Sequence, residues 1–334
     1  MEPLRIGILG AARIAGLAIV APARELGHRL VAVAARDRDR AAAFAAEHGV
    51  ERVSGSYADL LADPEVEVVY NGLVNGWHGP WNLAAIAAGK HVLTEKPFSS
   101  NAEEARVVRD AAARAGVQVL EGFHYLYHPV TSWLLETIGS GKLGEVREVE
   151  VVVDIEAPRS DDPRWSLDIA GGAVMDVGCY GVHLLRQLAP WTGAPRVASA
   201  RGVHRAGLSD VDEHMAVEFA FPSGAVGRMR CGMNADRLEF SCRVVGSAGT
   251  VMVQNFVRPD MDDTVVLTTE AGRTVRNLGR RPSYSFQLEA LAAQLRGGTG
   301  WRNDMDDAVA TMELIDDCYR AAGFPVRPRS EIRS

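Results

Sequence analysis

The fold is decided near the start of the chain by the stretch Leu4-Arg5-Ile6-Gly7-Ile8-Leu9-Gly10-Ala11-Ala12-Arg13-Ile14-Ala15. Its apolar first half predicts a buried strand, and Gly10 opens a turn into a helix. This order matches a dinucleotide fingerprint in which alanine replaces the second and third glycines, at Ala12 and Ala15. An ordinary α/β turn rich in glycine and alanine looks the same. The residues expected to contact a pyrophosphate are Gly10, Ala11, Ala12, Arg13 and Ile14.

Strand and helix patterns alternate from this stretch to Gly122. The later strands are expected at residues 30–35, 66–70, 91–93 and 117–120. A helix over residues 39–48 closes at Gly49, and Pro22 predicts a kink or an early stop in the first helix. Repeated β-α units favour a doubly wound parallel sheet. We therefore assign residues 1–122 to a dinucleotide-binding Rossmann domain of the α/β class.

The second strand ends in Arg36-Asp37-Arg38. An acid at this tip holds the ribose hydroxyls of NAD, whereas a guanidinium suits the 2′-phosphate of NADP and can stack on adenine. Arg36 occupies the tip and Asp37 follows it, so we expect both at the cofactor and favour NADP, with NAD as the alternative. A solvated arginine after a strand is the plainer interpretation.

A lysine stands against a proline in the segment Thr94-Glu95-Lys96-Pro97. The strand His91-Val92-Leu93 precedes it, and Ser99-Ser100-Asn101 follows as a helix cap, with Glu103 or Glu104 placed for a capping box. Lys96 therefore lies at the carboxyl end of a strand, where open parallel sheets bind ligands. We expect Glu95 and Lys96 to face the cofactor.

Another strand end carries the segment Leu73-Val74-Asn75-Gly76-Trp77-His78. Because it follows the strand at residues 66–70, it reaches the same edge of the sheet. Leu73, Asn75 and His78 are expected to line the nicotinamide site. The alternative is that Asn75 and His78 cap the helix over residues 79–89.

The pattern changes after Gly122, and residues 123–334 are expected to form a second, α+β domain. A helix at 130–139 precedes a β-branched strand at 146–155, and later strands alternate with turns such as Pro222-Ser223-Gly224 and Ser247-Ala248-Gly249. These hairpin signals predict a large, open, mainly antiparallel sheet with helices on one face. Its other face is a candidate interface for a homodimer or homotetramer. Two helices, near 285–296 and 304–322, finish the chain.

A second group of polar residues lies in the segment Gly171-Gly172-Ala173-Val174-Met175-Asp176-Val177-Gly178-Cys179-Tyr180-Gly181-Val182-His183. Asp176, Tyr180 and His183 are spaced to share one helical face. A polar stripe inside an apolar helix needs partners or a ligand. The alternatives are a buried hydrogen-bond network and a ligand site. The paired glycines favour close approach of a backbone or ligand.

The composition limits the classes of partner that the chain is expected to bind. The 334 residues carry 36 basic and 43 acidic side chains, a net charge of −7, which disfavours a nucleic acid partner. The four cysteines are far apart, so buried thiols are expected rather than a metal site or disulfides. A strand close to Met1 leaves no room for a signal peptide, and no apolar run reaches membrane-spanning length. We expect a soluble, cytoplasmic protein.

Four motifs together resemble the glucose-fructose oxidoreductase, inositol dehydrogenase and MocA (Gfo/Idh/MocA) family. They are the Gly10 turn, Glu95-Lys96-Pro97, the segment from Glu121-Gly122-Phe123 to His128-Pro129, and the Gly171–His183 segment. The resemblance is specific over residues 1 to about 190 and looser beyond. It implies a Rossmann domain followed by an open antiparallel sheet domain. It also implies NAD(P)-dependent oxidation or reduction of a sugar, polyol or cyclic diol at the domain cleft, and a Lys96-Pro97 peptide that is often cis.

The resemblance also implies catalytic roles for Lys96, Asp176 and Tyr180. Many members carry histidine where this chain has Tyr180, and the tyrosine resembles the dihydrodiol dehydrogenase and D-xylose dehydrogenase branch, where tyrosine is the proposed acid/base. Lys96 would lower the pKa of that phenol, and Asp176 would orient Lys96 or hold a substrate hydroxyl. Lys96 as the direct proton carrier stays open, with His183 or His124 next in line. His183 replaces a common aspartate, and Leu73-Val74-Asn75 replaces a common Thr-Pro-Asn.

Substrate contacts are expected from segments that converge on the cleft. The candidates are His124, Tyr127, Arg159, Trp165 and His183. Packing is the alternative for Tyr127 and Trp165, and solvation for the loop from Glu156 to Ala170. Two rival functions within the family are a redox-neutral, NAD-dependent glycosidase and a non-enzymatic dinucleotide-binding regulator. The presence of Lys96, Asp176 and Tyr180 argues against the regulator.

Overall fold

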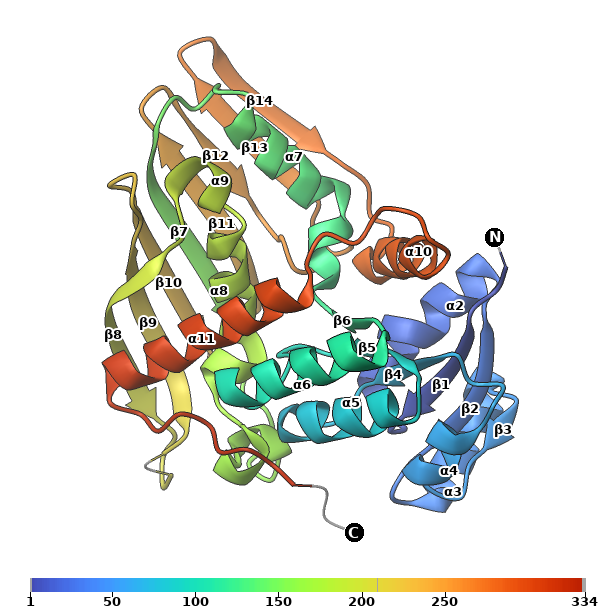
Figure 1. The fold of residues 1–334 in the computed structure, drawn as a ribbon. Helices are drawn as coiled ribbons and strands as arrows, with labels where there is room; N and C mark the ends of the chain where they lie inside the picture. Colours follow the sequence, from blue (N-terminus) through green and yellow to red (C-terminus); the bar gives the residue numbers. More distant parts are fainter. Residues whose placement is uncertain (1, 209, 332–334) are drawn as a thin grey trace. The chain divides into compact units, whose positions relative to one another are not determined.

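The computed structural model describes residues 2–208 and 210–331. These residues form two compact units, shown in Figure 1. Unit 1 comprises the chain up to Phe123, Tyr284–Val309 and the segment from Arg329 on, and unit 2 comprises His124–Ser283 and Ala310–Pro328. Each unit is described by itself.

The described part of unit 1 is built on a six-stranded sheet in which all neighbouring strands are parallel. The strands are β1 (Arg5–Leu9), β2 (Arg29–Ala34), β3 (Arg52–Val53), β4 (Val68–Asn71), β5 (His91–Thr94) and β6 (Val119–Glu121). Their order across the sheet is β3-β2-β1-β4-β5-β6. The order reverses between β1 and β4, which is the switch point where a doubly wound sheet binds its ligand. The predicted Rossmann fold is confirmed.

The crossover helices of unit 1 begin and end largely where the sequence predicts. They are α1 (Arg13–Ala15), α2 (Ala21–Leu26), α3 (Arg38–His48), α4 (Tyr57–Ala62), α5 (His78–Ala87) and α6 (Ala102–Ala115). Gly49 closes α3 in the left-handed conformation, and Asn101 caps α6 by accepting a hydrogen bond from the Glu104 N–H. Glu104 in turn accepts from the N–H of Ser100, which completes the expected capping box in a slightly widened form.

The first helix passes through Pro22 instead of ending before it. A π-helical segment, η1 (Gly16–Val20), joins α1 to α2, and Pro22 lies in the first turn of α2. Proline lacks the N–H that would bond a carbonyl of the preceding turn, so one backbone bond is missing where η1 passes into α2. The expected break is therefore a change of helix type within one continuous helical run.

Unit 1 also contains α10 (Ser283–Leu295), a helix that the sequence placed in the second domain. Its Leu288 and Leu291 are buried in one cluster with Leu93 and Leu120 from the sheet. Ser285 also donates a hydrogen bond to Glu25 of α2, beside which α10 is drawn in Figure 1. The sequence predicts this helix but does not show which core it joins. The prediction that all of residues 123–334 belong to the second domain therefore differs from the packing, which places residues 284–309 in unit 1. The domain boundary near Gly122 itself stays a prediction.

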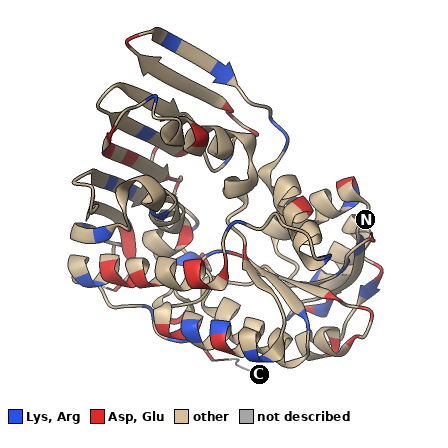
Figure 2. Ribbon diagram, turned by 45° about the horizontal axis from the view of Figure 1, so that its top comes forward, with Lys and Arg blue, Asp and Glu red and all other residues tan. Residues whose placement is uncertain are grey.

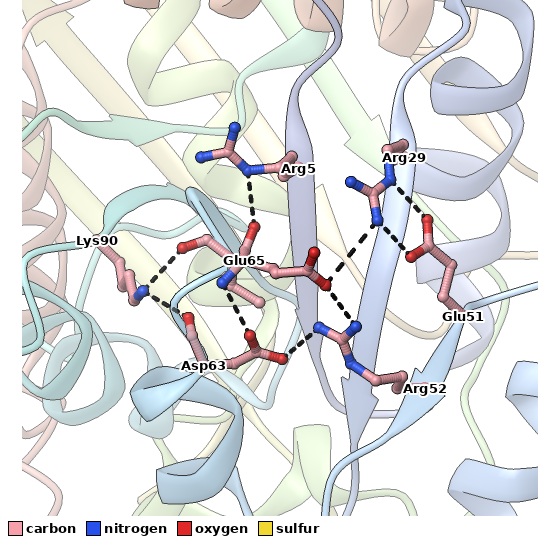
Figure 3. Close-up of polar contacts among 8 residues, drawn as sticks. Arg5, Arg29, Glu51, Arg52, Asp63, Glu65 and Lys90 are labelled. Atoms are coloured by element: carbon pink, nitrogen blue, oxygen red, sulfur yellow. Dashed lines mark hydrogen bonds and ion pairs between the residues drawn. The ribbon is translucent and has the colours of Figure 1, made fainter.

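A polar cluster ties the starting ends of the first three strands of unit 1 together (Figure 3). Arg29 of β2 forms a bidentate pair with Glu51, and Arg52 of β3 pairs with Asp63 and Glu65. Lys90 donates to two backbone carbonyls of the same loop. These charges lie at the amino ends of the strands, away from the edge that binds ligands. They serve the structure of unit 1.

The described part of unit 2 is built on an eight-stranded, mainly antiparallel sheet, as predicted. The strands are β7 (Val146–Asp154), β8 (Arg196–His204), β9 (Asp212–Ala220), β10 (Val226–Gly232), β11 (Glu239–Gly246), β12 (Gly249–Val253), β13 (Thr264–Thr269) and β14 (Gly272–Asn277). Their order is β14-β13-β12-β11-β7-β10-β9-β8, and only β7 and β10 among these neighbours pair in parallel.

One face of this sheet carries helices and the other carries charges. The helices are α7 (Pro129–Gly139), α8 (Cys179–Arg186), α9 (Ala189–Thr192) and the later part of α11 (Met305–Ala322). Figure 2 shows both basic and acidic residues on the strands of this sheet. Arg243 of β11 pairs with Glu150 of β7, and Arg228 of β10 with Glu218 of β9. The open face is thus a polar surface of mixed charge.

The described residues include no helix that is long and apolar enough to cross a membrane. The four cysteines all lie in the described part of the chain, buried and without a disulfide bond. Burial raises the pKa of the Cys242 thiol to about 12. The expected buried thiols are confirmed.

Candidate functional site

The turn after β1 has the conformation that a dinucleotide fingerprint needs. Gly10 has φ of 90°, which favours glycine, and its N–H bonds the carbonyl of Ala34 at 2.8 Å. Ala12 stands at the N-cap of α1, where an alanine side chain offers no capping bond to the first N–H groups of the helix. Arg13 and Ile14 are exposed beside them. This donor set fits a pyrophosphate group.

The tip of β2 is strongly basic. Arg36 is exposed, and its guanidinium carbon lies 5.0 Å from the ring centroid of Trp77. Arg40 reaches back from α3 and donates to the carbonyl of Ala11 in the glycine turn at 3.0 Å. Asp37 caps α3 by accepting from the N–H groups of Asp39 and Arg40, so its carboxylate has a structural use.

The loop after β4 is shaped by two buried side chains. Asn71 donates to the carbonyl of His78 at 3.1 Å. The two ring nitrogens of His78 lie 3.0 Å from the carbonyl of Leu73 and 2.7 Å from that of Pro97, and a neutral ring can donate to only one of them. Burial, assisted by the nearby Lys96 ammonium, lowers the pKa of His78 to about 4. The imidazole is therefore neutral at physiological pH and joins the ends of β4 and β5. The N-cap of α5 is Trp77, so the alternative capping role of Asn75 and His78 is not what the structure has.

Lys96 follows β5 directly, and the Lys96-Pro97 peptide is cis, as the resemblance implied. Lys96 is half-buried, whereas Glu95 is 6% exposed and accepts a hydrogen bond from the Tyr70 hydroxyl at 3.0 Å. Burial raises the pKa of the Glu95 carboxyl, and the adjacent Lys96 ammonium opposes that shift. Lys96 thus lies close enough to the Glu95 carboxyl and the His78 imidazole to influence the pKa of both.

In unit 2, the helix that carries the second polar group begins as a π-helical segment, η6 (Val174–Gly178), and continues as α8. The paired glycines differ in what approaches them: a Cβ on Gly171 would meet the backbone carbonyl of Arg164, whereas one on Gly172 would meet the side chains of Asp212 and Arg327. Arg164 also pairs with Asp176 at 3.3 Å. Hydrogen bonds to Asp162, helped by Asp176, raise the pKa of Arg164, so this cation stays charged.

Tyr180 and His183 are held by the short helix η3 (His124–Tyr127). The Tyr180 hydroxyl lies 3.0 Å from Nε2 of His124, and the Tyr125 hydroxyl lies 2.6 Å from Nδ1 of His183. Both histidines are fully buried, and Tyr180 is 5% exposed. The three side chains of the predicted polar stripe therefore contact different residues. Asp176 pairs with Arg164, Tyr180 contacts His124, and His183 contacts Tyr125.

The other predicted substrate contacts lie in different surroundings within unit 2. Trp165 is 4% exposed, donates to the carbonyl of Arg159 at 3.1 Å and is covered by the guanidinium of Arg205. Arg159 is exposed and pairs with Asp161. Tyr127 is buried. The structure thus joins Trp165 to the Arg159 backbone but not to its guanidinium.

Several residues at these sites escaped the sequence reasoning. They are Arg40, Tyr70, Tyr125 and Ser283. Arg40 lies in the first turn of α3, close in sequence to Arg36. The others are bound by contacts over 25 to 159 residues of sequence, for which no local pattern exists. Among the residues described, no three histidine, cysteine or acidic side chains are grouped to hold a metal ion.

Two family descriptions match the chain. Residues 4–123 match an oxidoreductase family with an NAD-binding Rossmann fold, GFO/IDH/MocA, and residues 133–252 match a GFO/IDH/MocA C-terminal domain.

Individual relatives match nearly the whole chain. D-xylose 1-dehydrogenase (NADP(+)) 2 of Haloferax volcanii is 34% identical over 96% of this chain and 97% of its own length. Trans-1,2-dihydrobenzene-1,2-diol dehydrogenase of mouse is 32% identical over 77% of this chain and 76% of its own length. Among solved structures, a 3-ketoreductase from Actinomadura kijaniata in complex with NADP and TDP-benzene superposes with a TM-score of 0.87. That structure is 26% identical and covers 96% of this chain and 98% of its own.

Proposed function

The chain belongs to the Gfo/Idh/MocA oxidoreductase family, and from this premise we propose that it transfers hydride between NADP and a hydroxyl-bearing carbon of a sugar, polyol or cyclic diol. The observation that carries the proposal is Lys96, held at the carboxyl end of β5 close enough to Glu95 and His78 to influence the pKa of both. Relatives named as NADP-dependent dehydrogenases of a sugar, and as dehydrogenases of a diol, support the substrate class.

The cofactor is proposed to lie along the carboxyl edge of the unit 1 sheet. The N–H groups at the start of α1, after Gly10, would bind the pyrophosphate, and the nicotinamide would lie toward the ends of β4 and β5. The residues proposed to contact it are Gly10, Ala11, Ala12, Arg13, Ile14, Arg36, Asp37, Leu73, Asn75, His78, Glu95 and Lys96. When bound, the cofactor accepts or supplies the hydride.

Two arginines support NADP over NAD. Arg36 is exposed at the tip of β2, and Arg40 reaches the same side of the glycine turn. Two guanidinium groups there match a 2′-phosphate, which carries more negative charge than a ribose hydroxyl. Asp37 is committed to capping α3, which weakens its competing role as a ribose acid for NAD.

The proton is proposed to pass between the substrate hydroxyl and Tyr180, with Lys96 as the cation that favours the phenolate. An unperturbed tyrosine has a pKa of about 10, so it needs such a cation to act as a base near neutral pH. Asp176 is proposed to act through Arg164 or through a substrate hydroxyl. His124, Tyr127, Arg159, Trp165 and His183 are proposed to shape the substrate side.

A substrate panel tests this function. Sugars, inositols and cyclic diols are assayed with NADP and with NAD by the absorbance of the reduced nicotinamide. We expect turnover of at least one polyhydroxy substrate, with a higher kcat/KM for NADP. Glycoside cleavage without cofactor exchange, or no uptake of either dinucleotide in calorimetry, would contradict the proposal.

The open face of the unit 2 sheet is proposed as the contact in a homodimer or homotetramer. Paired charges such as Arg243 with Glu150 let one copy of this face complement another across a two-fold axis. Light scattering that finds only monomers would contradict this assembly.

A further inference from the structure

Two tyrosine–histidine pairs connect the same two segments of unit 2, and the two segments supply the tyrosine and the histidine in opposite order. The turn η3 supplies a histidine and then a tyrosine, His124 and Tyr125, whereas α8 supplies the tyrosine first, Tyr180, and then His183. His124 lies 3.0 Å from the Tyr180 hydroxyl, and the Tyr125 hydroxyl lies 2.6 Å from His183. Each pair joins a phenol to an imidazole. A difference in function between the pairs must therefore come from their other contacts.

The difference lies at the second nitrogen of each imidazole. Nδ1 of His124 lies 2.7 Å from the hydroxyl of Ser283, and Nε2 of His183 lies 3.2 Å from the amide nitrogen of Gln187. His124 is 0% exposed, Ser283 1% and Tyr180 5%. The three form a buried chain of hydrogen bonds, Ser283 to His124 to Tyr180, whose first and last residues are far apart in sequence. Buried polar groups of this kind keep fixed partners.

The direction of the bond between Ser283 and His124 decides what His124 can offer to Tyr180, because a hydroxyl can donate to Nδ1 or accept from it. A serine hydroxyl can donate to Nδ1, and a neutral imidazole that accepts there carries its hydrogen on Nε2. Nε2 then donates to the Tyr180 oxygen, which can accept this bond and still keep its own proton for another partner. In the opposite tautomer the Tyr180 proton would be spent on Nε2, and the phenol could not give it to a substrate.

We propose that His124 is a positioning residue for Tyr180, with Ser283 fixing the imidazole tautomer that donates from Nε2 to the phenol oxygen. This inference rests on the proposed function, in which Tyr180 exchanges a proton with the substrate. The donated hydrogen bond stabilises phenolate more than phenol, because a charged acceptor makes the stronger bond. It also turns the phenol proton away from His124.

Other titratable groups surround the chain of bonds. The Tyr125 ring lies 6.0 Å from the Tyr180 ring and 5.6 Å from the His183 ring. Asp176, four residues before Tyr180 on the same helical run, is paired with Arg164. Variants that leave these groups in place therefore isolate the bond to the phenol.

The test is the pH dependence of kcat/KM in the direction of alcohol oxidation, for the full chain with NADP. His124→Met removes the donor, whereas His124→Gln keeps an N–H close to the position of Nε2. We expect His124→Met to move the acidic limb, on which Tyr180 must lose its proton to act as the base, to higher pH by about one unit, the size expected for losing one hydrogen bond to a charged group. His124→Gln should stay close to the wild-type profile. Ser283→Ala should shift the profile in the same direction by less.

Tyr125→Phe is the matched control. It removes the second tyrosine–histidine bond, from the same buried segment, but leaves the Tyr180 oxygen unchanged. The position of the acidic limb should therefore not move. Should His124→Met fail to fold, judged by circular dichroism and NADP binding, Ser283→Ala and His124→Gln still give the answer. If the limb of the Ser283→Ala profile lies at the same pH as in the wild type, or at a lower pH, the proposal is overturned.

The sign of the shift separates the two tautomers. If Tyr180 donated to His124, loss of the imidazole would destabilise the phenol and move the limb to lower pH, which contradicts the inference. Failure of the proposed function would look different. Tyr180→Phe would then keep its activity, whereas an inactive Tyr180→Phe with an unshifted His124→Met profile would overturn this inference alone.

Discussion

The two units hold their candidate functional side chains by different means. In unit 1 the side chains follow strand ends, and backbone groups fix them. The His78 ring lies against the carbonyls of Leu73 and Pro97, and the Gly10 N–H bonds the end of β2. In unit 2 distant side chains fix one another, as Tyr180 meets His124 and His124 meets Ser283. Backbone-held sites depend on local geometry, whereas the network of unit 2 depends on the whole unit being folded.

The largest expected effect tests whether both kinds of site serve one reaction. Lys96→Ala in unit 1 and Tyr180→Phe in unit 2 should each lower kcat by about 10²- to 10⁴-fold, the usual contribution of acid–base groups. NADP affinity, measured by calorimetry, should change little. Lys142→Ala, an exposed lysine, is the control and should leave kcat unchanged. Near-full activity of Tyr180→Phe would rule out Tyr180 as the base and make His183 or His124, also in unit 2, the next candidate.

A buried ion pair in unit 2 tests the comparison of the two units through protein stability. Arg327 and Asp212 are both fully buried in unit 2, where Asp212 also accepts from the N–H of Val174 at the start of η6. Arg327→Met leaves a carboxylate without its partner, which should cost about 3–5 kcal/mol of unfolding free energy in urea. Arg243→Met breaks the exposed pair with Glu150 and should cost less than about 1 kcal/mol. Equal losses of unfolding free energy in the two variants would show that burial does not increase the contribution of the ion pair to stability.

The same contrast explains what could be predicted from the sequence. The strand ends at Arg36, Asn75 and Lys96 follow from local periodicity, because a parallel sheet brings consecutive strand ends to one edge. The spacing of Asp176, Tyr180 and His183 indicated buried partners but not which ones. The π-helical turn of η6 changes the register that an α-helix would give, and His124 meets Ser283 across 159 residues.

A titration of unit 1 tests its backbone-held site. Burial holds the pKa of His78 at about 4 in the folded protein, against 6.5 when unfolded, so stability should fall as the pH is lowered from 6.5 to 4. The full effect is about 3 kcal/mol. Urea midpoints measured across this range should slope less in His78→Asn. Glu95 has a raised pKa and favours folding at low pH, and it is present in both proteins. Parallel slopes would contradict the burial of a neutral imidazole.

The smallest expected effect concerns the exposed tip of β2. Arg36→Ala should raise the KM for NADP about tenfold, the size of one charged hydrogen bond, and leave the KM for NAD unchanged. Arg38→Ala, the neighbouring exposed arginine, should change the KM for NADP by less than about twofold. An equal rise for NADP and NAD would mean that Arg36 does not recognise the 2′-phosphate.

The return of α10 to unit 1 bears on how this protein is made. Within the described residues the chain passes between the units four times, at 123/124, 283/284, 309/310 and 328/329. While a ribosome is still adding the residues of unit 2, the nascent nucleotide-binding unit lacks the helix that covers Leu93 and Leu120. Its core can close only after residues 284–309 have been added. A fragment that ends at Gly122 should therefore aggregate, and joining residues 284–309 to it should restore solubility.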